Sequence, residues 1–243
     1  MGGSVVRMPP GRPRSITAFF PCYNDAGTIG SMVLLMRATL RDLGTEFEIV
    51  VVDDGSSDHS RRILREVSAS VPELRVIEHG TNRGYGGALR SGFAAATKDW
   101  FFYTDGDFQY DVAELGALLS VWSEEVDLVN GYKIHRADPL HRKIIGRLYH
   151  WIVKIGFGLR VRDVDCDFRL IRRSLLQSLD LRFDSGVICL ELIRKLQDAG
   201  ARIAEVPVGH FFRAYGTSQF FRLGRILRVL RDLLRLRLQL WRG

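Results

Sequence analysis

The sequence predicts an α/β fold built on a mostly parallel sheet with helices on both faces. Three observations carry this prediction: short apolar strands alternate with helical stretches, polar clusters follow the strands, and no internal repeat breaks the pattern. The most informative cluster follows a buried aromatic strand and is Asp105–Gln109, which reads Asp-Gly-Asp-Phe-Gln. Carboxylates at the carboxyl end of a strand lie where open α/β sheets bind ligands, although a polar turn would have the same pattern.

Composition and charge limit the classes of function. The 243 residues suffice for one large α/β domain or two small ones, and 46% hydrophobic with 26% charged residues is ordinary for a globular protein. A formal net charge of +7 favours a polyanionic partner: nucleic acid, an anionic lipid surface or a phosphorylated substrate. The three cysteines are widely spaced and fit neither a disulfide framework nor a zinc site, which indicates a reducing compartment.

Elements in the first half follow a regular order. Residues 1–14 are expected to be a flexible leader, because they hold three prolines and no apolar signal-peptide core. Thr28 is a candidate N-cap for the first helix. Strands are predicted at 15–20, 46–52, 74–78, 101–104 and 127–130, and helices at 28–43, 58–69, about 85–96 and 111–120.

The second half is less regular. A basic segment spans 133–147, and Asp163, Asp165 and Asp167 alternate with other residues between 161 and 170. Helices are predicted near 173–179 and 187–199, and a last strand at 201–208. No charge-free apolar run approaches the roughly 18 residues that a membrane span needs, so we expect the chain not to cross a bilayer by itself.

The tail from Arg222 to Trp241 is predicted to be a basic amphipathic helix. Arginines recur every three or four residues and leucine or isoleucine fills the positions between them. Such helices lie on anionic membrane surfaces or pack on a partner helix, and the alternative is a helix docked on its own domain with solvated arginines. The charge on the basic face of this helix has a single sign, which favours contact with a membrane or a partner.

Three polar clusters are expected to meet at one sheet edge, since each follows a strand. They are Asp53-Asp54, the glycine-rich loop 80–87 and the Asp105–Gln109 motif. A glycine-rich loop that opens a helix offers backbone N–H groups and a positive dipole end to phosphate, although a simple helix-entry turn has the same composition. The loop lacks the glycine spacing of the dinucleotide-binding fingerprint.

These clusters resemble, in order, the motifs of family 2 glycosyltransferases with the GT-A fold. The donor-side resemblance rests on 21–25, 51–58, 82–88 and 105–109. Within the family, the segments 131–133, 138–143, 162–169 and 205–208 look most like dolichyl- or polyprenyl-phosphate hexose synthases. The resemblance covers about residues 15 to 220 and implies a GT-A domain at 15–221, followed by the helix at 222–243.

The resemblance implies a role for each matching position. The nucleoside-diphosphate sugar would be bound by Pro21, Tyr23, Asp25, Asp53, Asn82, Gly84, Gly86 and Asp105, with Asp53 hydrogen-bonded to the base. A Mg²⁺ or Mn²⁺ ion would be held by Asp105, Asp107 and Gln109. The phosphate of a polyprenyl-phosphate lipid would be bound by Lys133, Arg136, Arg142, Lys143 and Arg147, and catalysis would rest on Asp105, Asp107, Lys133 and Arg142.

Several positions depart from the family pattern. Asp25 stands where glutamate is usual, and Lys133 stands where arginine is usual, which keeps the charge but loses a bidentate fork. Gly146 replaces a serine that helps to hold the acceptor phosphate, and Asp167 replaces a common glycine. Many relatives carry C-terminal transmembrane helices, so a small transmembrane partner that docks the tail is a further hypothesis.

The reaction implied is an inverting displacement at the anomeric carbon of a UDP- or GDP-sugar by an oxygen of polyprenyl phosphate, at the cytoplasmic face of the membrane. An anionic nucleophile needs little help from a general base, while the leaving diphosphate needs a metal ion and the paired anions need cations. The residues leave open which sugar and which base are used.

Other readings remain open at this point. A hydroxyl acceptor would need a carboxylate base, for which Glu191 or Asp165 is available, although Glu191 on a surface helix needs no special role. A nucleotidyltransferase would carry a glycine-rich basic loop after its first strand, where this chain has 21–25. A non-catalytic nucleotide-sugar-binding module recruited to membranes is a third reading. Nucleic-acid binding is disfavoured, because no aromatic-interleaved basic signature is present.

Overall fold

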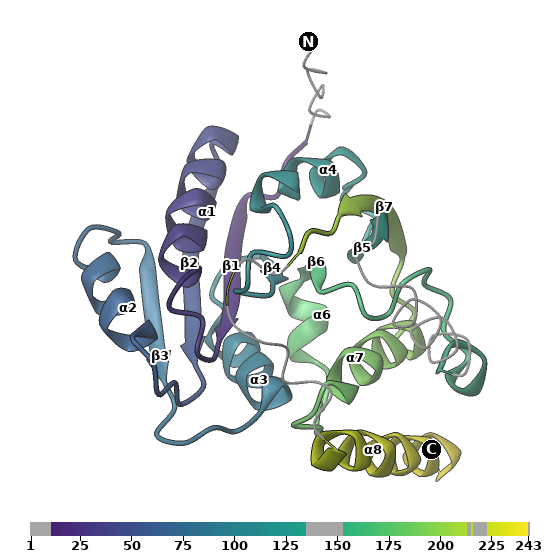
Figure 1. Ribbon diagram of the computed structural model, residues 1–243. Coiled ribbons are helices and arrows are strands. Elements are labelled where there is room, and N and C mark those ends of the chain that lie inside the picture. Colours follow the sequence, from purple (N-terminus) through teal and green to yellow (C-terminus); the bar gives the residue numbers. More distant parts are fainter. Residues whose placement is uncertain (1–10, 135–152, 213–214, 216–222, 243) are drawn as a thin grey trace.

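The sheet is mostly parallel, as the sequence predicted. The structure is a computed structural model that describes residues 11–134, 153–212, 215 and 223–242 (Figure 1). Over these residues, seven strands form one sheet in the order β3-β2-β1-β4-β6-β5-β7. Only the pairs that β6 makes with β4 and β5 are antiparallel. The strands are β1 (Ser15–Cys22), β2 (Glu46–Asp53), β3 (Leu74–Glu78), β4 (Trp100–Thr104), β5 (Leu128–Ile134), β6 (Phe168–Arg172) and β7 (Ile203–Gly209).

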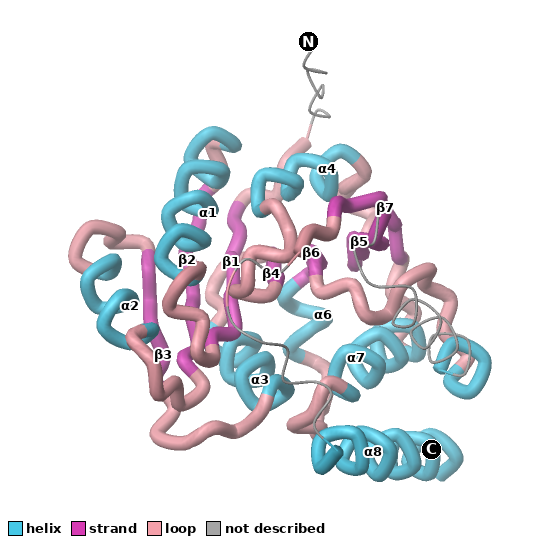
Figure 2. The backbone as a smooth tube through the Cα atoms, viewed as in Figure 1, coloured by secondary structure: helices cyan, strands magenta, loops and turns pink. Residues whose placement is uncertain are grey.

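Helices cover both faces of the sheet (Figure 2). The core cluster on one face draws on α1 (Ile29–Leu43), α2 (Ser60–Ser68) and α4 (Leu115–Ser120), which follows the short 3₁₀ helix η1 (Val112–Glu114). The cluster on the other face draws on α3 (Tyr85–Ala95), α6 (Arg173–Gln177) and α7 (Val187–Asp198). Outside α7 lies α8 (Leu223–Arg242), where the sequence predicts a basic helix (Figure 1).

Alternation along the central strands supplies both cores. In β4, Phe102 belongs to the cluster beneath α1, while Phe101 and Tyr103 belong to the cluster beneath α3 and α7. All five residues of β4 are buried, because this strand lies inside the sheet with layers on both faces. The buried aromatic run therefore fixes the position of the acidic motif that follows it.

Strand β6 was not predicted, and its second residue explains why. Arg169 interrupts a short apolar run, and the sequence alone suggests that such a charge faces solvent. Here Arg169 is 0% exposed, and its guanidinium donates to Asn130 Oδ1 (2.8 Å), to Asp167 Oδ1 (3.1 Å), to the Tyr103 hydroxyl and to the Val164 carbonyl. These partners come from β4, β5 and the 164–167 loop, so one buried cation joins the two antiparallel pairs.

None of the helices that the structure describes is both long enough and apolar enough to cross a bilayer.

We predict that Arg169→Leu lowers the free energy of unfolding by about 3–5 kcal/mol, because it leaves Asp167 and Asn130 without their buried partner. Urea denaturation followed by circular dichroism measures this loss. Arg62→Leu is the matched control, since the Arg62 side chain is 69% exposed and should change stability by no more than about 0.5 kcal/mol. Equal losses in the two variants would show that the buried network contributes nothing.

Candidate functional site

The acidic motif packs directly against the loop that follows β1. Strands β1 and β4 are parallel neighbours at the point where the strand order reverses, and open α/β sheets bind ligands at such a point. Thr28 is the N-cap residue of α1, as predicted, but its side chain makes no capping hydrogen bond. Its hydroxyl instead donates to the Gly106 carbonyl (2.7 Å). A Cβ added at Gly106 would lie 2.9 Å from the Pro21 carbonyl oxygen, so only glycine allows this contact. Asp25 and Asp105 are thereby brought to the same edge.

A second set of hydrogen bonds joins this loop to the end of β2. The Asn24 backbone N–H donates to Ser56 Oγ (3.0 Å), and Asn24 Oδ1 accepts from the Ser57 N–H (2.8 Å). The Ala26 N–H donates to Asp58 Oδ2 (3.1 Å). Asn24 has φ of 59°, a left-handed conformation that asparagine tolerates better than most residues. The loop with Tyr23 and Asp25 is therefore held rigidly against the loop after Asp53.

Each side chain of the acidic motif is oriented by a specific donor or acceptor. The Tyr85 hydroxyl donates to Asp105 Oδ1 (2.8 Å), and burial beside that carboxylate raises the pKa of Tyr85, so the phenol stays protonated. Asp107 is 4% exposed and accepts the Gln109 N–H at 3.0 Å. Gln109 Nε2 donates to the carbonyl of Phe211, so its amide oxygen points away from that residue.

Phe108, at the centre of the motif, has φ of 67°. A bulky residue in this left-handed region is strained, and such strain concentrates at functional sites. The turn at Phe108 lets Asp107 and Gln109 approach each other while the phenyl ring still packs on the core.

Asp54, rather than Asp53, organises the glycine-rich loop. Its buried carboxylate accepts the N–H groups of Arg83 (2.8 Å) and Gly84 (2.9 Å), and its carbonyl accepts Asn82 Nδ2 (3.1 Å). The same carboxylate bonds to His79 Nδ1 (2.7 Å), whose Nε2 meets Ser91 Oγ at 2.9 Å. These three side chains have the Asp–His–Ser order of a hydrolytic triad, but Ser91 lies within α3 and Asp54 already binds the glycine-rich loop. The role of this row of hydrogen bonds is therefore structural.

The N–H groups of Arg83 and Gly84 therefore bind a carboxylate of the protein, which favours the alternative of a helix-entry turn for these two groups. Asp54 is the anion at the N-terminus of α3, where the sequence also allowed a phosphate. The Gly86 N–H donates to the Asp184 carbonyl (2.9 Å), and a Cβ at Gly86 would lie only 2.0 Å from the Phe183 carbonyl oxygen. Because Gly84 and Gly86 have no side chain, the backbone of residues 183–184 can pack directly against them. A donor-binding role for Asn82, Gly84 and Gly86 must rest on other atoms.

Asp53 is also more enclosed than expected. Its side chain is 0% exposed and accepts Arg61 Nε at 2.7 Å and the Ser56 N–H at 3.3 Å. Base recognition by Asp53 stays a prediction, and it would require the carboxylate to accept a donor of the base in addition to Arg61 and Ser56.

Lys133 is the one residue predicted to bind the acceptor phosphate that lies within the described residues, and it is beside the aspartates of the 163–167 segment. Lys133 Nζ donates to the Asp165 carbonyl at 2.5 Å and lies 3.9 Å from Asp163 Oδ2. The Asp167 carboxylate accepts from the buried Arg169 and from Cys189, so the charge that departs from the family pattern is compensated. Arg136, Arg142, Lys143, Gly146 and Arg147 lie outside the described residues.

Glu191 is not the exposed helix residue that the sequence allowed. It is 0% exposed, because α7 is enclosed between the sheet and α8. Its carboxylate accepts the N–H groups of Arg182 (3.0 Å) and Phe183 (3.2 Å) and pairs with Lys195 Nζ (2.7 Å). These bonds hold the loop that reaches the glycine-rich segment, which is a positioning role.

The model of the family described as "Glycosyl transferase family 2" matches residues 17–180, more than half of the chain. The chain belongs to glycosyl transferase family 2. An undecaprenyl-phosphate 4-deoxy-4-formamido-L-arabinose transferase from Pectobacterium carotovorum is 30% identical over 227 residues, which cover 91% of this chain and 67% of the relative. The enzyme of the same name from Pectobacterium atrosepticum is 28% identical over 223 residues.

Solved structures confirm the GT-A-type architecture of this family 2 glycosyltransferase. Glucosyl-3-phosphoglycerate synthase from Mycobacterium tuberculosis, crystallised with Mn²⁺, UDP-glucose and phosphoglyceric acid, superposes with a TM-score of 0.70 at 22% identity, covering 92% of this chain and 80% of that one. A mannosyltransferase from Pyrobaculum calidifontis, in complex with GDP-mannose and Mn²⁺, gives 0.64 at 22% identity, covering 85% and 59%.

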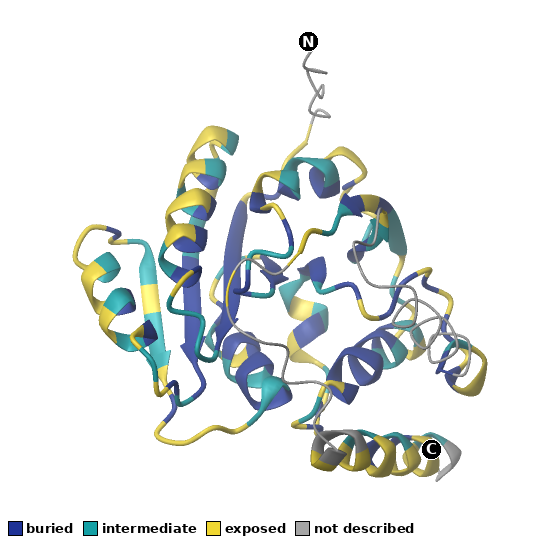
Figure 3. Cartoon of the chain, in the orientation of Figure 1, coloured by how far each residue is buried: buried dark blue, intermediate teal, exposed yellow. Residues whose placement is uncertain are grey.

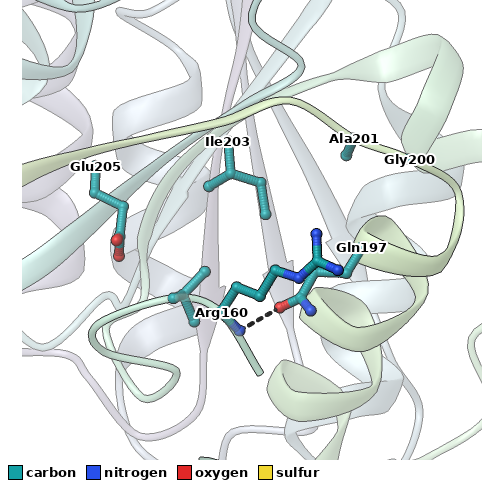
Figure 4. Close-up of a pocket in the computed structure, with 7 residues that line it drawn as sticks. Arg160, Gln197, Gly200, Ala201, Ile203 and Glu205 are labelled. Carbon is teal, nitrogen blue, oxygen red and sulfur yellow. Dashed lines mark hydrogen bonds between the residues drawn. The ribbon is translucent and has the colours of Figure 1, made fainter. Parts of the chain in front are cut away.

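A hollow of about 280 Å³ is lined by no residue of the donor-side motifs. Figure 4 shows it between the end of α7, the beginning of β7 and the 160–161 segment. The Arg160 N–H donates to Gln197 Oε1 (2.9 Å), and Glu205 accepts the Arg162 N–H (2.8 Å). It is lined by Arg160, Val161, Gln197, Gly200, Ala201, Ile203 and Glu205, none of which is a predicted site residue.

We predict that Gly86→Ala lowers the free energy of unfolding by about 1–3 kcal/mol, because the added methyl would push the 183–184 backbone out of place. Gly80→Ala, in the same loop, is the control: its Cβ would meet no atom within 4 Å, so the change should be neutral or stabilising by up to about 1 kcal/mol. Chemical denaturation of both variants measures the difference. A Gly86→Ala protein as stable as the control would mean that residues 183–184 yield without cost.

Proposed function

We propose that this family 2 glycosyltransferase moves a hexose or N-acetylhexosamine from a UDP- or GDP-sugar to polyprenyl phosphate, with inversion of the anomeric carbon. The observation that carries the proposal is the contact of the Asp105-Gly106-Asp107 motif with the loop around Asp25 at the strand-order reversal, on a chain whose curated relatives are undecaprenyl-phosphate sugar transferases. The relatives match over nine-tenths of this chain, including the acceptor-side segments.

The donor set fits Mg²⁺ or Mn²⁺. Asp105, Asp107 and Gln109 offer two carboxylates and an amide oxygen, the hard ligands that these ions prefer, and each is already oriented by a hydrogen bond. Within the described residues, no cluster of three or more histidine, cysteine, aspartate or glutamate side chains could cage a metal by itself. This suits an ion shared with the diphosphate of the donor. Such an ion would neutralise charge on the leaving diphosphate.

The residues of the chain supply binding and orientation rather than proton transfer. A phosphate oxygen of the acceptor attacks the anomeric carbon, a C–O bond forms there, and the nucleoside diphosphate departs with the electron pair of the broken C–O bond. Because the attacking oxygen is already anionic, no base is required. Lys133, with Arg136, Arg142, Lys143 and Arg147, would hold the acceptor phosphate against the repulsion of the donor. Pro21, Tyr23, Asp25 and Asp53 would enclose the nucleoside.

Transfer to a hydroxyl acceptor is the second candidate, and the solved relative from Mycobacterium tuberculosis was crystallised with phosphoglyceric acid. It would need a carboxylate base. The Glu191 carboxylate already accepts two backbone N–H groups and pairs with Lys195, which disfavours Glu191 as the base. Asp165 is then the remaining candidate.

The proposed acceptor is a membrane lipid, so we place the enzyme at the cytoplasmic face of the membrane as a peripheral protein. The basic helix α8 supports this placement. Nucleic acid is not proposed as a partner.

We predict that purified protein with Mn²⁺ or Mg²⁺ moves label from one member of a panel of radiolabelled UDP- and GDP-sugars into a short-chain polyprenyl phosphate. Asp107→Asn, which keeps the size of the side chain, should lower turnover by at least about a hundredfold, because the metal ion that would neutralise the leaving diphosphate loses a carboxylate ligand. Donor hydrolysis without lipid product would contradict the assignment of polyprenyl phosphate as the acceptor. Nucleotide binding without turnover would favour a non-catalytic binding module.

We also predict that Tyr85→Phe weakens Mn²⁺ binding in the presence of UDP by about tenfold or more, because the variant loses the hydrogen bond that orients Asp105. Isothermal titration with Mn²⁺ measures this without turnover. Tyr132→Phe is the control, since that ring packs under Arg162, outside the acidic motif. Unchanged Mn²⁺ affinity in Tyr85→Phe would show that the Tyr85 hydroxyl does not contribute to metal binding.

A further inference from the structure

Helix α8 has two apolar faces, and only one of them is used by the fold. The inner face is anchored by Leu236, which is 0% exposed in the core cluster beneath α7, with Val229, Leu233 and Leu240 packed against the same cluster. Asp232, 5% exposed, accepts a hydrogen bond from Ser185 Oγ at 2.8 Å. Figure 3 shows the exposed residues of α8 along the side that faces away from the domain.

The outer face of α8 carries four exposed leucines. Their exposed fractions are 58%, 52%, 68% and 53% for Leu227, Leu230, Leu234 and Leu238. Spacings of three, four and four residues place them in one row, because an α-helix turns once in 3.6 residues. A soluble domain gains nothing by arranging four large apolar side chains in such a row, so the row indicates a contact surface.

Arginines border this row on both sides. By the same helical geometry, Arg228, Arg231 and Arg235 lie along one border and Arg237 along the other, and all four are exposed. The helix contains one acidic residue, Asp232, and that residue is buried on the inner face. The outer face is thus apolar at its centre and purely cationic at its edges.

We propose that this outer face of α8 is a membrane-docking surface that lies flat on anionic lipid. Leucines would enter the boundary between headgroups and acyl chains, while the arginines would meet lipid phosphates. A second copy of the chain fits the face less well, because two such faces would bring arginines together with no carboxylate between them. Only the biological purpose of docking rests on the function proposed above. The test measures vesicle binding, which requires no turnover.

Docking would place the donor side of the site next to the lipid surface. Ser185, the partner of Asp232, is the neighbour of Asp184, whose carbonyl accepts the Gly86 N–H. A chain of direct contacts therefore runs from the membrane-docking helix to the glycine-rich loop. The acceptor phosphate would enter from the same surface on which the helix lies.

The test is co-sedimentation of the full chain with vesicles of phosphatidylcholine alone, or of equal parts phosphatidylcholine and phosphatidylglycerol. We expect binding to the mixed vesicles that weakens as salt rises, and at least about tenfold weaker binding by the double variant Leu230→Glu/Leu234→Glu. The matched control is Leu34→Glu/Leu35→Glu on α1, where the exposed fractions are 48% and 45%, and its binding should be unchanged. Both pairs replace exposed side chains, and thermal melting verifies that each variant folds.

A second variant tests the charge separately. Arg228→Ser/Arg235→Ser should lose the preference for anionic vesicles while it keeps weak binding to neutral ones, and it leaves in place Arg231, which pairs with Asp232 Oδ1 at 3.4 Å. Equal binding by the α8 and α1 leucine variants would overturn the proposal. Two further results would also overturn it. In the first, the wild-type chain does not bind vesicles and is dimeric in sedimentation velocity, while Leu230→Glu/Leu234→Glu is monomeric. In the second, the wild-type chain binds neither kind of vesicle and needs a protein partner to do so. Vesicle binding without any sugar transfer would overturn the proposed function and leave this surface in place.

Discussion

The buried carboxylate of Asp54 is the group on which the donor side of this molecule depends. Its oxygens accept two backbone N–H groups of the glycine-rich loop and bond to Nδ1 of His79, while the backbone N–H of Asp54 donates to the Cys22 carbonyl. The carboxylate therefore fixes the end of β2 relative to the residue after β3 and the beginning of α3, and the backbone of the same residue joins the end of β1. Hydrogen bonds to a charged acceptor are stronger than neutral ones, so this junction is stiff.

The opposite side of the glycine-rich loop is fixed by the same physical device. Glu191 is buried in α7 and accepts the N–H groups of Arg182 and Phe183, which positions the next residue, Asp184, to accept the Gly86 N–H. Two buried carboxylates thus hold the loop from two layers of the fold. The price of burying each charge is offset by several donors and, for Glu191, by Lys195. A rigid scaffold of this kind suits a reaction in which orientation of two anions is the main demand.

Sequence patterns were sufficient to predict the parallel strands and the position of the acidic motif at the end of one of them. The reason is that apolar strands followed by polar clusters have one simple arrangement. They failed where a charge is buried. Arg169 concealed β6, and Glu191 looked like a surface residue, since neither shows its partners until the chain is folded. Asp54 stands beside Asp53 in the sequence, and nothing there indicates which carboxylate would take the loop. Tyr85 could have been noticed as the phenol of the glycine-rich loop, but its contact with Asp105, 20 residues further along the chain, forms only when the beginning of α3 lies beside the end of β4.

The three buried cysteines give the protein built-in reporters of local opening. Burial raises the pKa of Cys22 and of Cys166 to about 12 and also raises that of Cys189, so all three are thiols that react with alkylating reagents only when their surroundings open. Cys22 ends β1 opposite Asp53, whereas Cys189 contacts Asp167 beneath the acceptor side. The rate of alkylation at each thiol would read the opening of the donor half and the acceptor half separately, in the unaltered chain, as each substrate is added.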